Sequence, residues 1–489
     1  MRLLALAILL SFSTTILAQS IDSFQLKSAF IKDSRLIKVW TPKDYSKDKK
    51  YTVVYTLDAS LIFDITCSDV NYLSSKDVGA IPNTIVVGVF FKDRNEDMGI
   101  MWEASTLNEK GQSFQKMLNE ELVPYIDKNY PTTGFNTIIG HSNSSTYINF
   151  LLLDAKGKFK GFIAMSQYEL DADEKNFTEM LQGKLSETIY YFVASASKDA
   201  EYRVKSGQNF EQIFDSTSNP QVKFEHHLFK KGNHLTVALM GLPQGLVHVY
   251  QDFKSLDETD EALIAALSKT KTNPLAYLKK HKEDLEKLYG IQPVSTIDDL
   301  YFMMTLAEKN RDFAQIQELW DFAQTEYKDE EGLNFLFAQL YEGAGILKTA
   351  ESFYLKHLET DDFKAYYAYS RPFYLYYTHQ KDPVKAIKMA KRANKEYAKE
   401  SEDYSFYYHI AQTSAKYNTK SYAGRKAIEK YIENHKKGAR FPLEKAYYQK
   451  AVIYTNSRRS YEAKKLLEQA IELNPDFEAA KDLLEELNE

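Results

Sequence analysis

The stretch Phe135-Asn-Thr-Ile-Ile-Gly-His-Ser-Asn-Ser-Ser145 decides how the first half of this chain is interpreted. Its β-branched run, 137–139, predicts a buried strand, and the apolar segment 147–153 predicts a helix soon afterwards. Ser142 therefore lies on a sharp strand-to-helix turn, with small residues two positions before and after it. Such a turn strains the serine backbone, as in the nucleophile elbow of G-x-S-x-G sequences. The pattern alone fits two interpretations equally, a catalytic elbow or an ordinary turn with a surface serine.

Length and composition set the outer limits. A chain of 489 residues is too long for one ordinary core and indicates roughly two to four domains. Its hydrophobic fraction of 44% and charged fraction of 27% are typical of a soluble globular protein. The net charge of −6 argues against nucleic acid as the main partner. The single cysteine, Cys67, excludes an intrachain disulfide and leaves the cellular compartment open.

The N-terminus has the pattern of an export signal. A positive start, Met1-Arg2, precedes an apolar run from Leu3 to Leu10, and small and polar residues follow it. This order predicts a secretory signal peptide over residues 1–19. The run is too short to span a membrane, and no other segment is long and apolar enough to do so. We therefore expect an exported protein, in the periplasm or outside the cell.

Residues 20–255 alternate strand-like and helix-like segments. Strands are predicted at 35–40, 51–57, 85–90, 137–139, 162–165, 189–194 and 222–229, and helical spacing at 114–130. This alternation predicts an α/β domain with a mostly parallel sheet and helices on both faces. Active sites of such sheets lie at the carboxyl ends of the strands.

Two of the later strands are followed by residues suited to activating Ser142. Asp199 comes just after the strand 189–194, with Glu201 as a second carboxylate, and His234 lies in a glycine-containing loop after the last strand. A serine hydroxyl needs a histidine to accept its proton, and the histidine needs an acid to orient it. The order Ser142, Asp199, His234 is that of α/β-hydrolases. We predict these three as a catalytic triad, with Glu201 as the alternative acid.

No other cluster of polar residues predicts a cofactor or metal. His226 and His227 are neighbours within a strand pattern, so only one of them can face the core. We interpret both as structural. No spacing of His, Cys or carboxylate residues is typical of a metal site.

Residues from about 30 to 255 resemble the esterase D-like family of α/β-hydrolases, which includes feruloyl and siderophore esterases. The resemblance rests on the stretches 53–58, 81–89, 121–126, 140–142 and 234–237, together with Arg94, Asp97 and Ser166. It implies that Ser142 is the nucleophile, His234 the general base and Asp199 the acid. It also implies an oxyanion hole formed by the backbone N–H of Asn143 and one from the loop at Asp58 and Ala59.

The chain departs from the family pattern at the turn and beside the pocket. Ser144 and Ser145 replace the paired glycines after the nucleophile, and Ala59 replaces the glycine after Asp58. All are small, so we expect the turn and the oxyanion hole to persist with a tighter pocket.

Two further loops are expected at the pocket. The usual Ser-Pro after the strand 162–165 is Ser166-Gln-Tyr here, and in the family that loop faces the site. Gln167 and Tyr168 are therefore expected to contribute to selectivity. For Trp102, lining the entrance and packing are equally good interpretations.

After Ser255 the pattern becomes helical almost without interruption to Glu489. Residues 256–295 predict a helical connector and residues 296–489 a set of helical repeats. Ala314, Ala350, Ala386, Ala423 and Ala463 are spaced by 36, 36, 37 and 40 residues, close to the tetratricopeptide period of about 34. The last unit, with Ala451, Tyr454, Ala463, Leu467, Ala470 and Pro475, fits best.

The repeat also accounts for most of the 35 tyrosines as packing residues, because aromatic rings fill the gap above small residues. Such repeats present surfaces that bind proteins or peptides. A second interpretation is that here they dock on the hydrolase domain and cover its pocket. The alternative is a set of irregular helices that only shields the hydrolase domain.

Two functions agree with these patterns. The first is an exported serine esterase acting on a small-molecule ester. The second is a scaffold or binding protein whose hydrolase domain has lost catalysis and whose repeats bind a partner. The serines at the glycine positions favour the second slightly, and the intact Ser-Asp-His set favours the first more strongly.

Overall fold

The computed structural model describes residues 20–489 except 76–77, 155–156, 329, 361–364 and 398–400. The chain divides into two compact units, which are described separately. The first comprises the described residues up to Ser255 together with Lys279–Val294, and the second comprises Leu256–Leu278 and Ser295–Glu489. The expected connector, 256–295, is thus shared between the two units. The predicted signal peptide, 1–19, lies outside the described residues.

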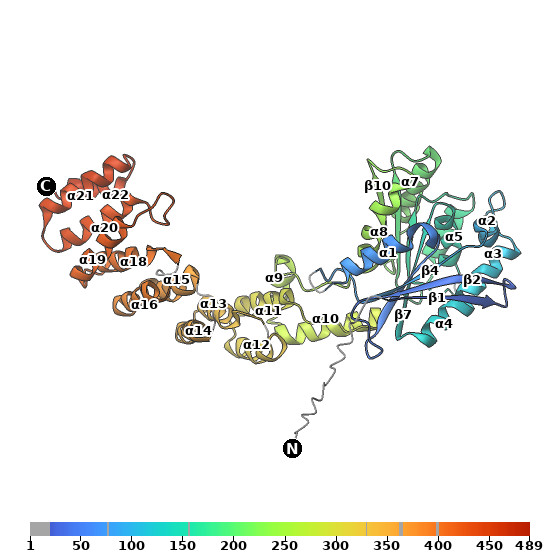
Figure 1. The fold of residues 1–489 in the computed structure, drawn as a ribbon, viewed down its shortest axis with the longest axis horizontal. Helices are drawn as coiled ribbons and strands as arrows, with labels where there is room; N and C mark the ends of the chain where they lie inside the picture. The colour runs from blue at the N-terminus through green and yellow to red at the C-terminus, as the bar shows by residue number, and fades with distance from the viewer. Residues whose placement is uncertain (1–19, 76–77, 155–156, 329, 361–364, 398–400) are drawn as a thin grey trace, which may run out of the picture. The chain divides into compact units, whose positions relative to one another are not determined.

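The first unit is built on a sheet of eight described strands in the order β1-β2-β4-β3-β7-β8-β9-β10 (Figure 1). The strands are β1 (Ser20–Ser28), β2 (Asp33–Thr41), β3 (Tyr51–Thr56), β4 (Thr84–Val89), β7 (Thr132–His141), β8 (Gly161–Met165), β9 (Ile189–Ala196) and β10 (Val222–Phe229). The pairs β1–β2 and β2–β4 are antiparallel, and all other neighbours are parallel. Strands β3, β4 and β8 are buried along their whole length, because helices cover both faces.

Two sets of helices cover the faces of this sheet. Helices α1 (Ala59–Leu73) and α8 (Thr236–Val249) contribute to one core, together with Tyr289 at the end of α10 (Pro274–Tyr289). The other core includes residues of α3 (Glu109–Lys116), η1 (Met117–Leu122), α4 (Val123–Asn129), α5 (Asn143–Leu152), α6 (Asp173–Gln182) and α7 (Glu201–Ser216). The short elements α2 (Arg94–Met98), β5 (Ile100–Met101) and β6 (Thr106–Leu107) lie in the connection after β4. The predicted fold class is confirmed.

The second unit is all helical in its described residues. Its remaining helices are α9 (Glu261–Lys269), α11 (Ile297–Asn310), α12 (Phe313–Glu326), α13 (Leu333–Gly343), α14 (Leu347–Thr360), α15 (Tyr366–Tyr374), η2 (Leu375–His379), α16 (Pro383–Glu396), α18 (Ser405–Lys416), α19 (Ser421–Glu433), α20 (Leu443–Asn456), α21 (Ser460–Leu473) and α22 (Glu478–Glu486). Consecutive helices pack as hairpins, with α13 against α14, α18 against α19 and α20 against α21. No helix of the described chain combines the length and apolar character that a membrane crossing requires.

The structure corrects the register of the repeat. A buried position recurs at the fourth residue of α12, α14, α16, α19 and α21. These residues are Ile316, Ala350, Ala386, Gly424 and Ala463, and all five are buried. The sequence prediction was right at three positions and wrong at Ala314, which is exposed, and at Ala423, which is half-buried. At Gly424 a Cβ atom would lie 2.5 Å from the Ser414 Cβ, so glycine replaces alanine where α18 and α19 approach most closely.

We expect Gly241→Ala to destabilise the first unit by about 1–3 kcal/mol, because overpacking a core costs that much. A Cβ at Gly241 in α8 would lie 2.6 Å from the Ala194 Cβ in β9, and neither atom can move without shifting backbone. Urea unfolding of the full chain measures the effect. Gln244→Ala, on the exposed face of the same helix, is the control and should stay close to wild type. Equal stability of the two variants would contradict the close helix–sheet contact.

A second prediction concerns acid sensitivity of the helical unit. His409 in α18 is fully buried. Its Nδ1–H donates to Gln412 Oε1 (3.2 Å), so Nε2 of the neutral ring accepts from the Tyr366 hydroxyl (2.7 Å). Burial lowers the pKa of His409 to about 4 despite the Gln412 contact. Because the unfolded chain binds a proton near pH 6.5 and the folded chain does not, stability is present above pH 6.5 and is lost as the pH falls toward 4.

We therefore expect the stability around α18 to fall by about 2 kcal/mol between pH 7 and pH 5. Hydrogen exchange of α18 peptides during urea unfolding measures this loss. In His409→Gln the pH dependence should flatten, whereas His379→Gln, at a half-exposed histidine of η2, should keep it. A wild-type unfolding free energy that is independent of pH over this range would refute the prediction.

Candidate active site

Ser142 connects β7 to α5 in a strained conformation. Its backbone has φ 61° and ψ −126°, a region that non-glycine residues rarely adopt. The Ser142 N–H donates to the Met165 carbonyl at the end of β8 (2.8 Å), which fixes the turn above the sheet. The turn is tight, since a Cβ at Gly140 would lie 2.4 Å from the Ser144 carbonyl oxygen. The geometry is that of a nucleophile elbow.

The elbow is bonded to the loop after β3 through Asp58. The Ser144 hydroxyl accepts the His141 N–H (2.8 Å) and donates to Asp58 Oδ2 (2.6 Å). Arg94 forms a two-pronged ion pair with the Asp58 carboxylate, and its Nη2 also donates to the His141 carbonyl (2.8 Å). Asp58 itself adopts a left-handed conformation, φ 52°, directly before α1. One buried carboxylate therefore holds two chain segments together.

The contacts of Asp58 join the N-terminus of α1 to the N-terminus of α5. Ala59 is the first residue of α1 and Asn143 is the first residue of α5. The first backbone N–H groups of a helix have no partner within that helix, so both are available to a developing negative charge. The family resemblance assigns the Asn143 N–H and one N–H from the loop at Asp58 and Ala59 to the oxyanion hole.

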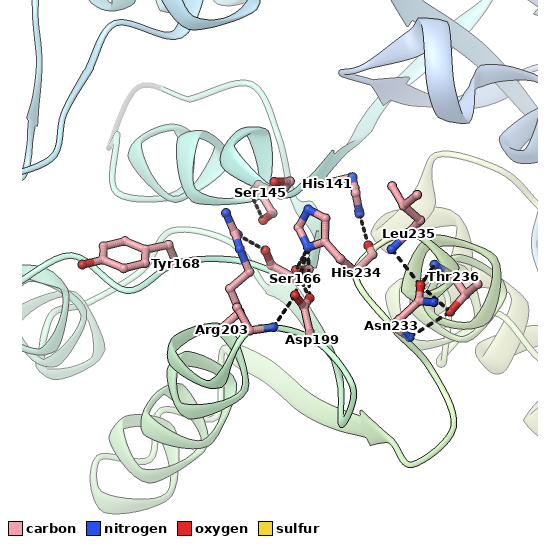
Figure 2. Close-up of polar contacts among 12 residues, drawn as sticks. His141, Ser145, Ser166, Tyr168, Asp199, Arg203, Asn233, His234, Leu235 and Thr236 are labelled. Carbon is pink, nitrogen blue, oxygen red and sulfur yellow. Dashed lines mark hydrogen bonds and ion pairs between the residues drawn. The ribbon is translucent and has the colours of Figure 1, made fainter.

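His234 contacts Asp199 beyond the ends of β9 and β10 (Figure 2). Its Nδ1 lies 3.1 Å from each carboxylate oxygen of Asp199. The hydroxyl of Ser166, the first residue after β8, donates to Asp199 Oδ2 and lies 2.9 Å from His234 Nδ1. The Asp199 side chain is 3% exposed and that of His234 is 37% exposed. Asp199 and Ser166 therefore orient the His234 ring through Nδ1, while part of the side chain stays exposed to solvent.

The surroundings of Asp199 keep it ionised. Burial alone raises the pKa of a carboxyl group, but hydrogen bonds from Ser166, the Ala200 N–H and His234 outweigh burial and leave the Asp199 pKa below its ordinary value. The ring of His141 lies beside that of His234, with 5.0 Å between their centroids, and its Nε2 contacts the His234 carbonyl (2.6 Å). Burial lowers the pKa of His141, so this ring is neutral and donates from Nε2.

The remaining residues predicted for the site are the alternative acid and the three pocket residues. Glu201 lies on the exposed surface of α7 and pairs with Lys205 (2.7 Å), away from His234. We expected Gln167 to contribute to selectivity at the pocket. In the structure its side chain is 1% exposed and hydrogen-bonded to Asn149 and Tyr191. Trp102 and Tyr168 are in edge contact at 5.5 Å, and Trp102 is 39% exposed. No hydrogen bond among the described residues joins Ser142 Oγ to the His234 ring.

Two residues of the site were not predicted from the sequence. Ser166 was noted only as part of the family pattern, and its hydroxyl supports both Asp199 and His234. Arg203 in α7 gave no signal, yet it donates to the Ser166 carbonyl and to Asn143 Oδ1 (3.0 Å). In the described part of the chain, no group of three His, Cys, Asp or Glu side chains is placed to hold a metal ion.

The fold and the site define an α/β-hydrolase unit followed by helical repeats. Residues 28–218 match the family model described as "Putative esterase", and residues 444–477, which span α20 and α21, match the model described as "Tetratricopeptide repeat". Both matches confirm the resemblances drawn from the sequence, and the second falls on the repeat that fitted best.

Several individual proteins are similar to this chain. A Bacillus subtilis protein, described as "Uncharacterized protein YjcH", is 30% identical over 146 residues, which are 28% of this chain and 58% of the relative's length. The crystal structure of an uncharacterised protein from Capnocytophaga ochracea superposes with a TM-score of 0.56 at 21% identity, covering 73% of this chain and 100% of that one. An IroE-like serine hydrolase from Shewanella oneidensis gives 0.48 at 19% identity, over 62% and 99% of the two chains.

We expect Asp58→Asn to lower the free energy of unfolding of the first unit by about 3 kcal/mol or more, because it leaves Arg94 partly buried without a counter-charge. Thermal and urea unfolding measure the loss. Asp64→Asn, an exposed residue of the same helix region, removes the same charge and should leave stability within about 0.5 kcal/mol of wild type. Comparable stability of both variants would show that the ion pair does not hold the elbow.

Proposed function

We propose that this chain is an exported serine esterase that hydrolyses a carboxylic ester through Ser142, His234 and Asp199. The observation that carries the proposal is the contact of Asp199 with Nδ1 of His234 at the sheet edge where Ser142 occupies its strained turn. A serine elbow alone is compatible with an inert turn, whereas an oriented histidine over an ionised carboxylate is the arrangement that makes serine nucleophilic. The esterase family match over residues 28–218 supports the same reaction class.

The roles follow from the hydrogen bonds. Asp199 and Ser166 accept from the Nδ1–H of His234, which leaves Nε2 as the basic nitrogen. Nε2 takes the proton of Ser142 Oγ as this oxygen attacks the ester carbonyl, and the protonated ring then gives the proton to the leaving alcohol. Water, activated in the same way, releases the acid from Ser142. The Ser142–His234 hydrogen bond that this relay needs is often long in unliganded enzymes.

The oxyanion of each tetrahedral intermediate is assigned to the N–H groups of Ala59 and Asn143. Because Asp58 and Arg94 hold these groups in place before substrate arrives, little reorganisation is needed during the reaction. Trp102 and Tyr168 are proposed to line the approach to Ser142, whereas Gln167 supports the floor of the site.

Export and partner binding belong to the same proposal. The pattern of residues 1–19 supports secretion, so N-terminal sequencing of the protein recovered from the periplasm or medium should begin at residue 19 or 20. The tetratricopeptide match at 444–477 supports binding of a protein or peptide by the helical unit.

The esterase proposal is tested with a fluorophosphonate probe and 4-nitrophenyl acetate. We expect wild type to be labelled and to hydrolyse the ester, and Ser142→Ala to do neither. Labelling of Ser142→Ala, or an unreactive wild type, would overturn the proposal.

The identity of the acid is tested with two matched carboxylate-to-amide changes. Asp199→Asn should lower kcat by about 10²–10⁴-fold, because the amide no longer stabilises the imidazolium. Glu201→Gln, two residues away on the exposed surface, should stay within about twofold of wild type, since its only ion pair is with Lys205. The opposite ranking in steady-state assays would transfer the role of acid to Glu201.

A further inference from the structure

Arg203 is a buried cation beside the proposed nucleophile. It lies in the first turn of α7, is 8% exposed, and reaches toward Ser166 and the elbow (Figure 2). Its Nη1 donates to the Ser166 carbonyl, its Nη2 donates to Asn143 Oδ1 (3.0 Å), and the guanidinium lies 5.4 Å from the Tyr202 ring centroid. Both hydrogen-bond acceptors are neutral.

The two other arginines that support this end of the sheet are paired differently. Arg35, also buried, forms a two-pronged ion pair with Asp97, and Arg94 does the same with Asp58. Among the described residues, no carboxylate forms an ion pair with Arg203; the acid of the site, Asp199, is bonded to Ser166, Ala200 and His234. An arginine side chain stays charged inside a protein, and a buried charge without a counter-ion is costly.

The position of Arg203 adds to this cost. The N-terminal turn of a helix carries partial positive charge, which disfavours cations there. Arg203 has five N–H groups, and the Ser166 and Asn143 contacts use two of them. The remaining N–H groups donate to no acceptor among the described residues and are left to donate to an anion, and the two neutral contacts hold the guanidinium plane in place for it.

Aromatic side chains continue the surface away from Arg203. Tyr202 contacts Tyr168 edge-on, and Tyr168 contacts Trp102 in the same way, each at 5.5 Å between centroids. Tyr202 is 53% exposed and Trp102 is 39% exposed, so both rings present area to solvent. The guanidinium therefore lies between an apolar wall and the residue that follows Ser142.

We propose that Arg203 binds a carboxylate carried by the substrate, so that the esterase acts on esters with a free carboxylate within a few atoms of the scissile carbonyl. Half-esters of dicarboxylic acids and acyl esters of hydroxybenzoic acids have this chemistry. The counter-ion missing from the protein is supplied by the substrate, through a charge-assisted and preferably two-pronged hydrogen bond. This inference rests on the proposed function, because it names the substrate class of the same site.

The test compares charged and neutral substrates of matched size. On the acyl side, 4-nitrophenyl hydrogen succinate is compared with 4-nitrophenyl butyrate; on the alcohol side, 4-acetoxybenzoate is compared with its methyl ester. We expect wild type to prefer the charged member of at least one pair by about tenfold or more in kcat/KM. Arg203→Gln should lose about tenfold or more on that charged ester and less than about threefold on its neutral match.

Two further variants separate recognition from support. Arg203→Lys keeps the charge and should retain part of the preference. Lys205→Gln removes a cation two residues away on α7, where the lysine pairs with Glu201 in solvent, and should leave the preference unchanged. Equal losses on charged and neutral esters in Arg203→Gln would show that Arg203 only supports Ser166 and Asn143. That result, or a wild type without charge preference in either pair, would overturn the inference.

The inference can also be decided if the chain does not hydrolyse esters. In that case monomethyl succinate remains intact and serves as a ligand in calorimetry, with methyl butyrate as the neutral comparison. Binding of monomethyl succinate that is lost in Arg203→Gln and kept in Lys205→Gln would support the carboxylate site while the esterase proposal fails. Absence of binding to wild type would overturn the carboxylate site as well.

Discussion

The ion pair between Asp58 and Arg94 is the constraint on which the rest of the site depends. The two backbone N–H groups proposed to bind the oxyanion come from segments more than eighty residues apart, the starts of α1 and α5. Asp58 joins them because its carboxylate receives Arg94 and the Ser144 hydroxyl at once, while Arg94 also reaches the His141 carbonyl. Parallel pairing brings β3 and β7 side by side, and this buried pair, together with the Ser144 hydroxyl, fixes the relative position of their loops.

The same contact explains the serines that replace glycines at the elbow. From sequence, Ser144 and Ser145 suggested a tighter pocket. Both are buried, and their hydroxyls bond to Asp58 and to the Ser142 carbonyl rather than facing substrate. In the proposed esterase, selectivity is therefore assigned to the loops that carry Trp102 and Tyr168 and to the first turn of α7. The substitutions strengthen the turn and do not count against catalysis.

Local patterns were enough to predict most of the fold. Buried β-branched runs identified the central strands because such strands must be apolar on both faces. Chain order predicted that Ser142, Asp199 and His234 follow strands at one sheet edge, and the structure shows the contact between Asp199 and His234. The sequence could not rank Asp199 above Glu201, because it does not show that the Asp199 carboxylate is buried against His234 while that of Glu201 is exposed.

Other features had no local signal at all. Arg203 lies in an ordinary charged helix sequence, and only the folded chain places its guanidinium beside Asn143. In the repeats, alanine spacing alone was one or two residues out of register at Ala314 and Ala423. The buried residues are Ile316 and Gly424, a larger and a smaller residue that the alanine pattern did not include.

Strain gives the strongest argument about function: three neighbouring strands, β3, β7 and β8, are followed by Asp58, Ser142 and Ser166 with φ of 52°, 61° and 58°. Each such backbone costs about 1–3 kcal/mol and persists only where surrounding contacts hold it. Here the contacts are the Arg94 pair, the Met165 carbonyl and the Arg203 bond, all directed at one edge of the sheet. A hydrolase fold kept only as a scaffold for its repeats has no need to maintain strained backbone at the ends of three adjacent strands. The strain therefore favours a working site over an inactive remnant.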